Sequence, residues 1–147
     1  MSLKERIQQD MKDSMRGGNK SRLGVIRLIL AAIKQREVDE RIELDDTQVT
    51  IVLDKMAKQR RESISQFEKA GRTDLVDQEV AELQIIQEFL PEQLDEAEIN
   101  ALIEAAMEQT GASSIKDMGK VMGQLKPKLQ GRADMSAVSA LIKARLG

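Results

Sequence analysis

The sequence predicts an all-α protein with an N-terminal bundle of about four helices followed by a small C-terminal three-helix domain. Two observations support this. Leu, Ile, Met, Ala, Glu, Lys and Gln recur along the whole chain, and no segment shows the alternating pattern of a strand. Residues typical of helix starts and helix ends also divide the chain into seven segments. We place the boundary next to Pro91, which gives domains over residues 1–92 and 93–147.

The first two helices are expected to form one side of the bundle. Ser2 followed by Glu5 is a capping box, and Gly17-Gly18 should end the first helix. The second helix should run from about Lys20 to Arg41. Its centre is apolar on nearly all sides, so we expect it to lie centrally in the bundle.

The third helix should begin at a cap made by Asp45 or Asp46 and reach Ala70, just before Gly71. Its apolar stripe is interrupted by a polar stretch that contains Arg60. Buried polar groups need partners, so this part of the helix should either leave the bundle or be tied to another helix.

Thr73 can cap a fourth helix, which should end before Pro91. Its acidic residues offer partners for the third helix. We expect Arg60 to reach either Glu82 or Glu88 as a tie between the two helices.

Three further helices are expected in the C-terminal part. Asp95, Ser114 and Asp134 are their predicted caps, and the first two helices should end at Gly111 and Pro127. A module of this size has a small core and is expected to be only marginally stable alone.

Charge is distributed unevenly along the chain. Residues 1–73 carry 16 basic and 12 acidic groups, residues 74–110 carry 11 acidic groups and no basic group, and residues 111–147 carry seven basic and two acidic groups. The middle segment should repel polyanions, and the two ends should tolerate or attract them. The alternative is that the acidic helices are ordinary solvated surfaces.

Composition excludes several kinds of site. The chain has no His and no Cys, so the common zinc sites, thiol nucleophiles and histidine bases cannot be built. We expect neither a metal nor a cofactor. The two aromatic residues, Phe67 and Phe89, do not suffice for a base-stacking platform, which disfavours sequence-specific binding of single strands but leaves contacts to a nucleic-acid backbone open.

No membrane segment or secretion signal is expected. The most apolar stretch, Val25 to Ile33, is broken by Arg27 and is shorter than the ~20 residues that span a bilayer. The N-terminus is charged from Lys4 onward and lacks an apolar secretory core, so we expect a cytoplasmic protein.

Five short motifs carry a resemblance to a known family. They are Lys58–Ser63, Phe67–Arg72, Phe89–Leu94, Lys116–Met122 and Gly131–Asp134. In this order they resemble the YqeY family over nearly the whole chain. The family usually has Tyr at the position of Phe89.

The resemblance implies a helical N-terminal domain and a C-terminal domain similar to the tail of the GatB subunit of glutamine-dependent tRNA amidotransferases. That tail contacts the elbow of the RNA. The expected partner is therefore tRNA or another structured RNA, or a complex for aminoacylation or amidotransfer. Catalysis in those enzymes takes place in other parts, which have no counterpart in these residues, so no intrinsic activity is expected.

The first candidate site is a C-terminal group of cations set among Gly119, Gly123 and Gly131. Its members are Lys116, Lys120, Lys126, Lys128 and Arg132. We expect the first two lysines to share a helix face and the other three cations to lie on an irregular link around Pro127. Such a surface suits RNA phosphates. The alternative is that the Gly131–Asp134 motif only caps the last helix, which we accept for Asp134 itself.

The second candidate is a basic edge on the second helix, formed by Lys20, Arg27, Lys34 and Arg41 at seven-residue spacing. Such an edge could follow phosphates for roughly 30 Å. We favour the alternative that these cations pair with acids of the same chain, such as Glu37.

Three functions remain open at this stage. The preferred one is a non-catalytic module that binds tRNA or structured RNA. The second is a helical protein–protein adaptor that holds a partner helix on the second helix or near Met118 and Met122. The third is glutamine-dependent carbon–nitrogen ligase activity, which would release glutamate from glutamine.

Overall fold

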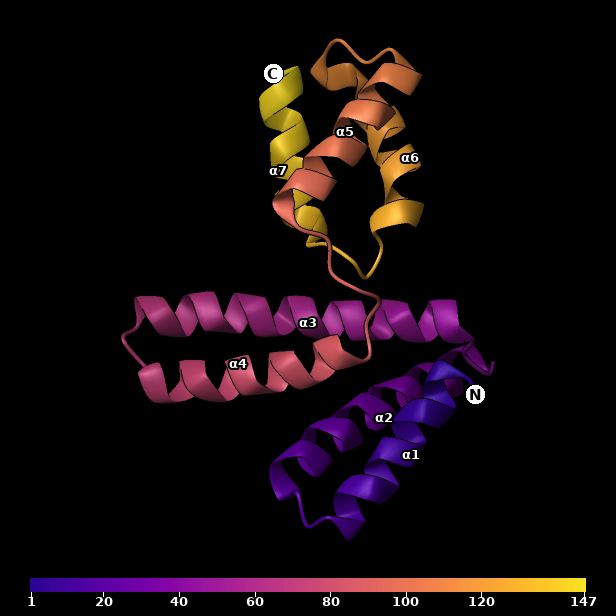
Figure 1. Cartoon of the computed structure of the whole chain (residues 1–147), viewed down its shortest axis with the longest axis vertical. Coiled ribbons are helices and arrows are strands. Elements are labelled where there is room, and N and C mark those ends of the chain that lie inside the picture. Colours follow the sequence, from indigo (N-terminus) through magenta and orange to yellow (C-terminus); the bar gives the residue numbers. More distant parts are fainter. The chain divides into compact units, whose positions relative to one another are not determined.

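The computed structural model describes residues 1–147 and confirms the all-α prediction (Figure 1). There are seven α-helices and one short 3-10 helix. The helices are α1 (Leu3–Arg16), α2 (Lys20–Glu40), α3 (Asp46–Lys69), α4 (Thr73–Glu88), α5 (Glu96–Thr110), α6 (Met118–Leu129) and α7 (Met135–Leu146), and the 3-10 helix η1 spans Ile115–Asp117.

Residue contacts group the chain into two compact units, Met1–Pro91 and Glu92–Gly147. We call them the first and the second unit and describe each by itself. The predicted division into domains at residues 1–92 and 93–147 stays a prediction, which the core substitutions at the end of this section test.

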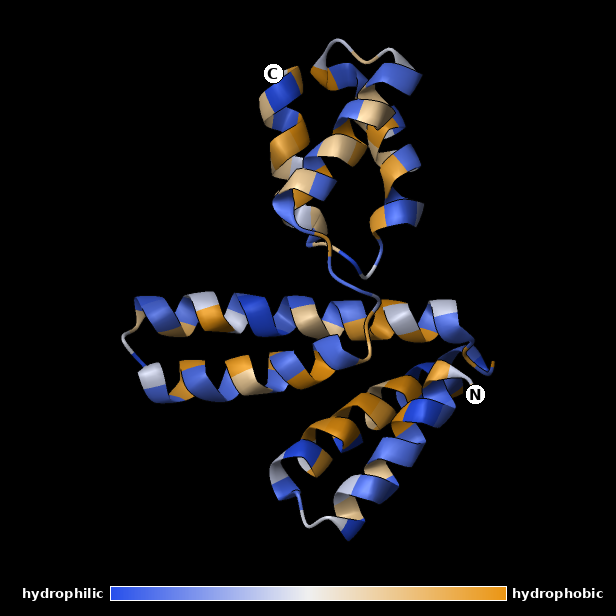
Figure 2. Ribbon diagram, in the orientation of Figure 1, coloured by the Kyte–Doolittle hydropathy of each residue, from blue (hydrophilic) through white to orange (hydrophobic).

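The first unit consists of two helical hairpins, α1 with α2 and α3 with α4 (Figure 1). Its core collects apolar side chains from all four helices, because the inward stripes of α1, α3 and α4 pack on the strongly apolar α2 (Figure 2). The fully buried members of this core are Ile7, Ile26, Ile29, Val49, Leu53, Ala57 and Ile86.

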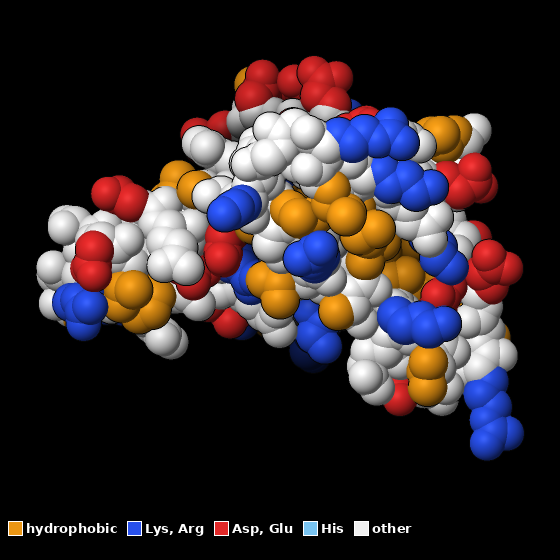
Figure 3. All heavy atoms as spheres, turned by 90° about the horizontal axis from the view of Figure 1, so that it is seen from below, with side chains coloured by type: hydrophobic (Ala, Val, Ile, Leu, Met, Phe, Trp, Pro, Cys, Tyr) orange, Lys and Arg blue, Asp and Glu red, His pale blue; other side chains and the backbone are white.

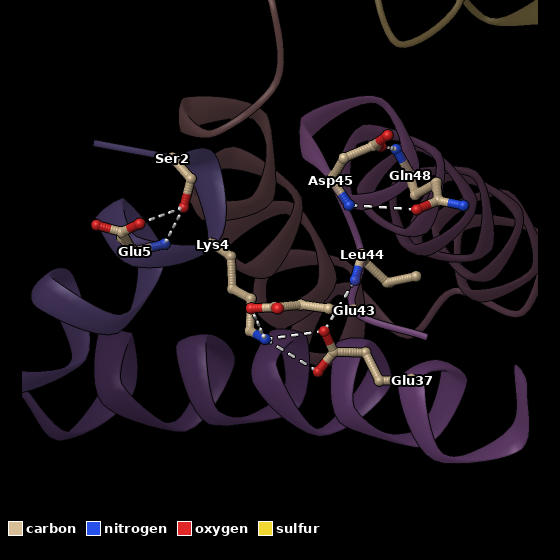
Figure 4. Close-up of polar contacts among 8 residues, drawn as sticks. All are labelled: Ser2, Lys4, Glu5, Glu37, Glu43, Leu44, Asp45 and Gln48. Carbon is tan, nitrogen blue, oxygen red and sulfur yellow. Dashed lines mark hydrogen bonds and ion pairs between the residues drawn. The ribbon is translucent and has the colours of Figure 1, made fainter. Parts of the chain in front are cut away.

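Side-chain caps fix the predicted helix starts. The backbone amide of Glu5 donates to Ser2 Oγ at 3.1 Å. Asp45, rather than Asp46, caps α3, and the cap is reciprocal because Gln48 N donates to Asp45 Oδ1 while Asp45 N donates to Gln48 Oε1 (Figure 4). The prediction for α4 is wrong by one residue, since Thr73 is already helical.

Arg22 joins three helices of the first unit. From α2, it donates to both carboxylate oxygens of Asp10 on α1, at 2.9 and 2.7 Å, and to Glu88 at the end of α4, at 2.7 Å. The buried Phe89 ring lies beside it, with the guanidinium carbons of Arg6 and Arg22 at 5.3 and 6.0 Å from the ring centre. Charge-assisted hydrogen bonds and cation–π contacts therefore hold the first hairpin to the end of the second.

Arg60 confirms the predicted tie between α3 and α4. Its Nε lies 2.9 Å from a carboxylate oxygen of Glu82 and 3.6 Å from one of Glu79. The other expected partner, Glu88, pairs with Arg22 instead.

The second unit is a three-helix module of α5, α6 and α7, preceded by the cap Asp95, whose side chain accepts from Glu98 N at 2.8 Å. Its separate core contains Ile103, Val121, Leu125, Leu129, Val138 and Ile142. The expectation that Pro127 ends the sixth helix is wrong. Pro127 lies inside α6, which continues to Leu129, and the lost N–H bond falls in the last turn, where it costs the helix least.

None of the helices combines the length and the low polarity that crossing a membrane requires.

Core substitutions test whether the two units unfold separately. We expect Leu53→Ala to destabilise the first unit and Ile142→Ala the second, each by about 3 kcal/mol, because both side chains are fully buried. Hydrogen exchange resolved by segment measures this. Each substitution should raise exchange within its own unit and leave the other unit unchanged. Equal loss of protection in both units would show that the chain unfolds as one domain.

The Arg22–Asp10 pair predicts a defined pH dependence. Hydrogen bonds from Arg22 are the main cause that lowers the pKa of Asp10 below its ordinary value of 3.8. The pair therefore stabilises the fold at pH values above 3.8, and this contribution is lost as the pH falls through the lower pKa of the folded state.

Asp10→Asn should accordingly reduce the free energy of unfolding by about 1–2 kcal/mol at neutral pH. The difference from the parent protein should disappear in acid, which denaturation at a series of pH values measures. Asp77→Asn, at an exposed position of α4, is the control and should have little effect at any pH. A pH-independent loss in Asp10→Asn would contradict the assignment.

Candidate nucleic-acid interface

The structure places the five predicted C-terminal cations within one stretch of the second unit. Lys116 lies on η1, the lysines at 120, 126 and 128 lie on α6, and Arg132 lies in the turn between α6 and α7. The expectation that Lys126 and Lys128 occupy an irregular link is wrong, because α6 extends through both. A regular helix therefore sets the directions of three of the five side chains.

The buried stripe of α6 determines where its lysines point. Val121, Leu125 and Leu129 face the core at four-residue spacing, so the opposite side of the helix faces solvent. At about 100° per residue, Lys120 lies about 40° from the middle of this outer side, whereas Lys128 lies about 120° from it on the same flank, next to the buried stripe. Lys126 lies on the opposite flank, about 80° from the middle of the outer side.

Four of these cations have no acidic partner. Lys116, Lys120, Lys126 and Lys128, which we call the C-terminal lysines, are exposed and form no ion pair. The acids of this unit are concentrated elsewhere, because α5 carries four glutamates and no basic residue. Of the glutamates on α5, Glu104 pairs with Arg145 of α7 at 3.5 Å. The C-terminal lysines are therefore available to an external anion.

Arg132 differs from the lysines. Its Nε donates to the carbonyl oxygen of Glu92 at 3.1 Å, and its own carbonyl accepts from Leu94 N at 2.9 Å. Gln93 adds a bond from its side chain to the carbonyl of Gly131 at 2.6 Å. Arg132 therefore holds the start of the second unit to the α6–α7 turn, and it is a weaker candidate for RNA contact than the lysines.

The two acids close to the C-terminal lysines in sequence are used as caps. Asp117 accepts from the amides of Ser113 and Ser114 at 3.0 and 3.2 Å, and these bonds, more than the charge of Lys120, lower its pKa. Asp134 accepts from Ser136 N at 3.1 Å, which confirms its predicted role as the cap of α7. Capping by these acids leaves the lysines unpaired.

Two of the three glycines leave the backbone of α6 without a covering side chain. A Cβ added at Gly119 or Gly123 would meet no atom within 4 Å, so both positions face open space where a ligand can approach the backbone. Gly131 has a different role, because its φ of 77° is a turn conformation that favours glycine.

The second basic candidate is unpaired, contrary to the interpretation we favoured. Lys20, Arg27, Lys34 and Arg41, here called the α2 basic edge, are exposed and form no ion pair. The expectation that all four lie on the helix is wrong for Arg41, which is the left-handed C-cap after Glu40. The proposed partner Glu37 is occupied, since it pairs with Lys4 of α1 at 2.8 Å and accepts from Leu44 N at 2.9 Å (Figure 4). These bonds are the main causes that lower the pKa of Glu37, and the charge of Lys34 adds only a smaller contribution.

Sequence reasoning missed the exposed apolar side chains beside this edge. Leu28 and Val38 on α2 are 49% and 60% exposed. The signal was available, because a helix that is apolar on nearly all sides cannot bury every side within a four-helix unit.

The structure brings no three of its acidic side chains into an arrangement that could hold a metal ion.

Comparison with known proteins identifies similar sequences. A family model described as "Yqey-like protein" matches residues 4–146. A protein of Pyrenophora tritici-repentis named "Altered inheritance of mitochondria protein 41, mitochondrial" is 33% identical over 97% of this chain and 80% of its own length. A protein of the same name from Lachancea thermotolerans is 30% identical over 92% of this chain and 76% of its own length. A third, from Eremothecium gossypii, is 40% identical over 57% of this chain, which corresponds to 46% of that protein.

These names correct the expectation of a cytoplasmic location. The relatives are named as mitochondrial proteins, whereas our expectation rested on a charged N-terminus without a secretory core. That feature argues against secretion only. It does not separate the cytosol from the mitochondrial interior, because targeting sequences for mitochondria also contain basic residues and lack a long apolar core.

The turn that carries Lys116 offers a local test. Asp117→Ala should remove the acceptor for the Ser113 and Ser114 amides and reduce the stability of the second unit. Exchange of those two amides, followed by NMR, should accelerate, while amides in the first unit keep their rates. Asp117→Asn retains one acceptor oxygen and should preserve part of the protection. Unchanged exchange in Asp117→Ala would contradict the capping role.

Proposed function

Because this chain belongs to the YqeY family of Yqey-like proteins, we propose that it binds a structured RNA, with tRNA the first candidate, through the C-terminal lysines. The observation that carries the proposal is that all four lysines are exposed and without an acidic partner on η1 and α6. The resemblance of the second unit to the RNA-contacting tail of GatB supports the same ligand.

The geometry favours contacts to phosphates over contacts to bases. The lysines follow successive turns of one helical stretch, so their charges can reach neighbouring phosphates along a strand. The second unit contains no aromatic residue on which a base could stack. Recognition would then depend on the shape of the RNA and on the spacing of its phosphates.

Charge asymmetry orients the RNA on the second unit. The glutamates of α5 repel phosphates, whereas η1 and α6 attract them. Only one side of the unit is thus suited to an RNA backbone. This arrangement explains how a chain with a net charge of −2 can bind a polyanion.

The proposed role is not catalytic. The chain contains neither His nor Cys, and the enzymes that the second unit resembles carry out amidotransfer in other parts. The names of the relatives make a mitochondrial tRNA the first RNA to test.

Binding to tRNA at several salt concentrations tests the proposal. Two or three phosphate contacts should give a slope of about −2 to −3 in a plot of log K against log salt. Lys120→Glu/Lys128→Glu should weaken binding roughly tenfold or more and reduce the slope by about 2. Arg132 is left unchanged because its side chain also supports the fold.

Lys12→Glu/Lys69→Glu is the matched control, with the same change of charge at two exposed positions of the first unit. It should keep most of the affinity. A salt slope near zero, or an equal loss in the control, would remove the proposal.

A further inference from the structure

The strongest feature that the proposed function leaves unexplained is the solvent-facing side of α2. This helix buries Ile26, Ile29 and Ile33 in the core of the first unit and still carries apolar side chains on its outer side. Leu28 and Val38 are 49% and 60% exposed. When several exposed apolar side chains of this size lie close together, they mark a surface that binds another molecule.

The exposed residues of α2 form one continuous stripe. Gly24, Leu28, Ala31, Gln35 and Val38, here called the α2 seam, follow one another at steps of four and three residues, and all are exposed. This spacing is that of the contact positions of paired helices. A Cβ added at Gly24 would meet nothing within 4 Å, so the seam also contains an open notch that a larger side chain can enter.

A groove lies directly beside the seam. It has a volume of about 530 Å³ between α2 and α3, and Gln35 belongs to both seam and groove. Its apolar lining comes from Ala32 on α2 and from Ile51, Val52 and Met56 on α3. Figure 3 shows one face on which hydrophobic side chains gather in the middle with Lys and Arg side chains beside them.

The flank of the seam is basic and unpaired. Lys20, Arg27 and Lys34 of the α2 basic edge run along one side of the seam at seven-residue spacing, without an acidic partner. The acids on the other side are engaged, since Glu40 pairs with Arg36 and Asp39 accepts from Gln35 Nε2 at 2.9 Å. The surface therefore combines an apolar stripe with a row of free positive charges.

We propose that the α2 seam and its groove bind an amphipathic helix of a protein partner, whose apolar stripe fills the seam and whose acidic flank faces the α2 basic edge. Helix-in-groove binding requires an apolar stripe and a neighbouring groove, and both are present. The unpaired cations select an acidic helix over a basic one.

The same observations argue against two other occupants. A second copy of α2 in antiparallel orientation would bring the two basic edges together, and the cations of one helix would repel those of the other. A nucleic-acid backbone would satisfy the cations but would leave Leu28 and Val38 without an apolar partner. An acidic amphipathic helix satisfies both parts of the surface.

A designed peptide tests the proposal with the full chain. The peptide is a stable helix with Leu at the heptad contact positions and Glu on the flanks, and its matched control has Lys in place of Glu. Fluorescence anisotropy should show binding of the acidic peptide and none of the basic peptide. Leu28→Gln/Val38→Gln and, separately, Arg27→Gln/Lys34→Gln should each weaken binding roughly tenfold or more.

Matched control variants lie outside α2, with Ile115 in the second unit and Lys12 and Lys69 on α1 and α3 of the first unit. Ile115→Gln removes an equally exposed apolar side chain, and Lys12→Gln/Lys69→Gln removes two exposed cations. Both should bind the acidic peptide like the parent protein. Failure of the acidic peptide to bind at millimolar concentration, or equal losses in the controls, would overturn the proposal.

Two further binding measurements distinguish an acidic helix from a lipid surface and from RNA as the ligand of this face. If Arg27→Gln/Lys34→Gln and Leu28→Gln/Val38→Gln reduce binding to vesicles of phosphatidylglycerol while peptide binding is unaffected, the surface is a lipid site and the proposal is wrong. Loss of tRNA binding with unaffected peptide binding would assign the face to RNA instead. The C-terminal lysines are unchanged in all these variants, so the RNA proposal for the second unit stands or falls separately.

Discussion

The functional account depends on the separation of charge within the second unit. Apart from Glu92, its acids lie on α5 or act as caps, while the lysines of η1 and α6 are exposed without an acidic partner. A lysine that is paired inside the fold would have to give up that partner to bind a phosphate, and the exchange would gain little free energy. Unpaired lysines gain the full attraction and release counterions from the RNA. This separation explains how a weakly acidic chain can present a phosphate-binding surface.

The first unit follows a different constraint, which is the strongly apolar α2. Three helices pack on this helix, and Arg22 connects it to Asp10 and Glu88 at the point where both hairpins meet. Since only part of α2 can be covered in this way, an apolar seam remains in solvent next to an unpaired basic edge. The two surfaces belong to different units, and we propose different partners for them: phosphates for the second unit and an acidic helix for the first.

Much of the fold follows from local signals, because caps and glycines act within a few residues. The caps Ser2, Asp95 and Asp134 lie where the sequence predicts them. The wrong predictions concern features that depend on residues distant in the sequence or on the position of a residue within its helix. Pro127 is tolerated because it lies in the last turn of α6, and this placed two lysines on a helix that the sequence had assigned to a link. Glu37 was unavailable to the α2 basic edge because Lys4, 33 residues earlier, takes it, and only packing of α1 on α2 reveals this.

Lysine footprinting is the most direct test of the central claim, since it reads each side chain in the intact protein. The folded chain is acetylated briefly with and without a saturating amount of tRNA, and modification at each lysine is measured by mass spectrometry. We expect tRNA to protect Lys116, Lys120, Lys126 and Lys128 and to leave Lys12 and Lys69 as reactive as before. Uniform protection of all lysines, or protection confined to the first unit, would contradict it.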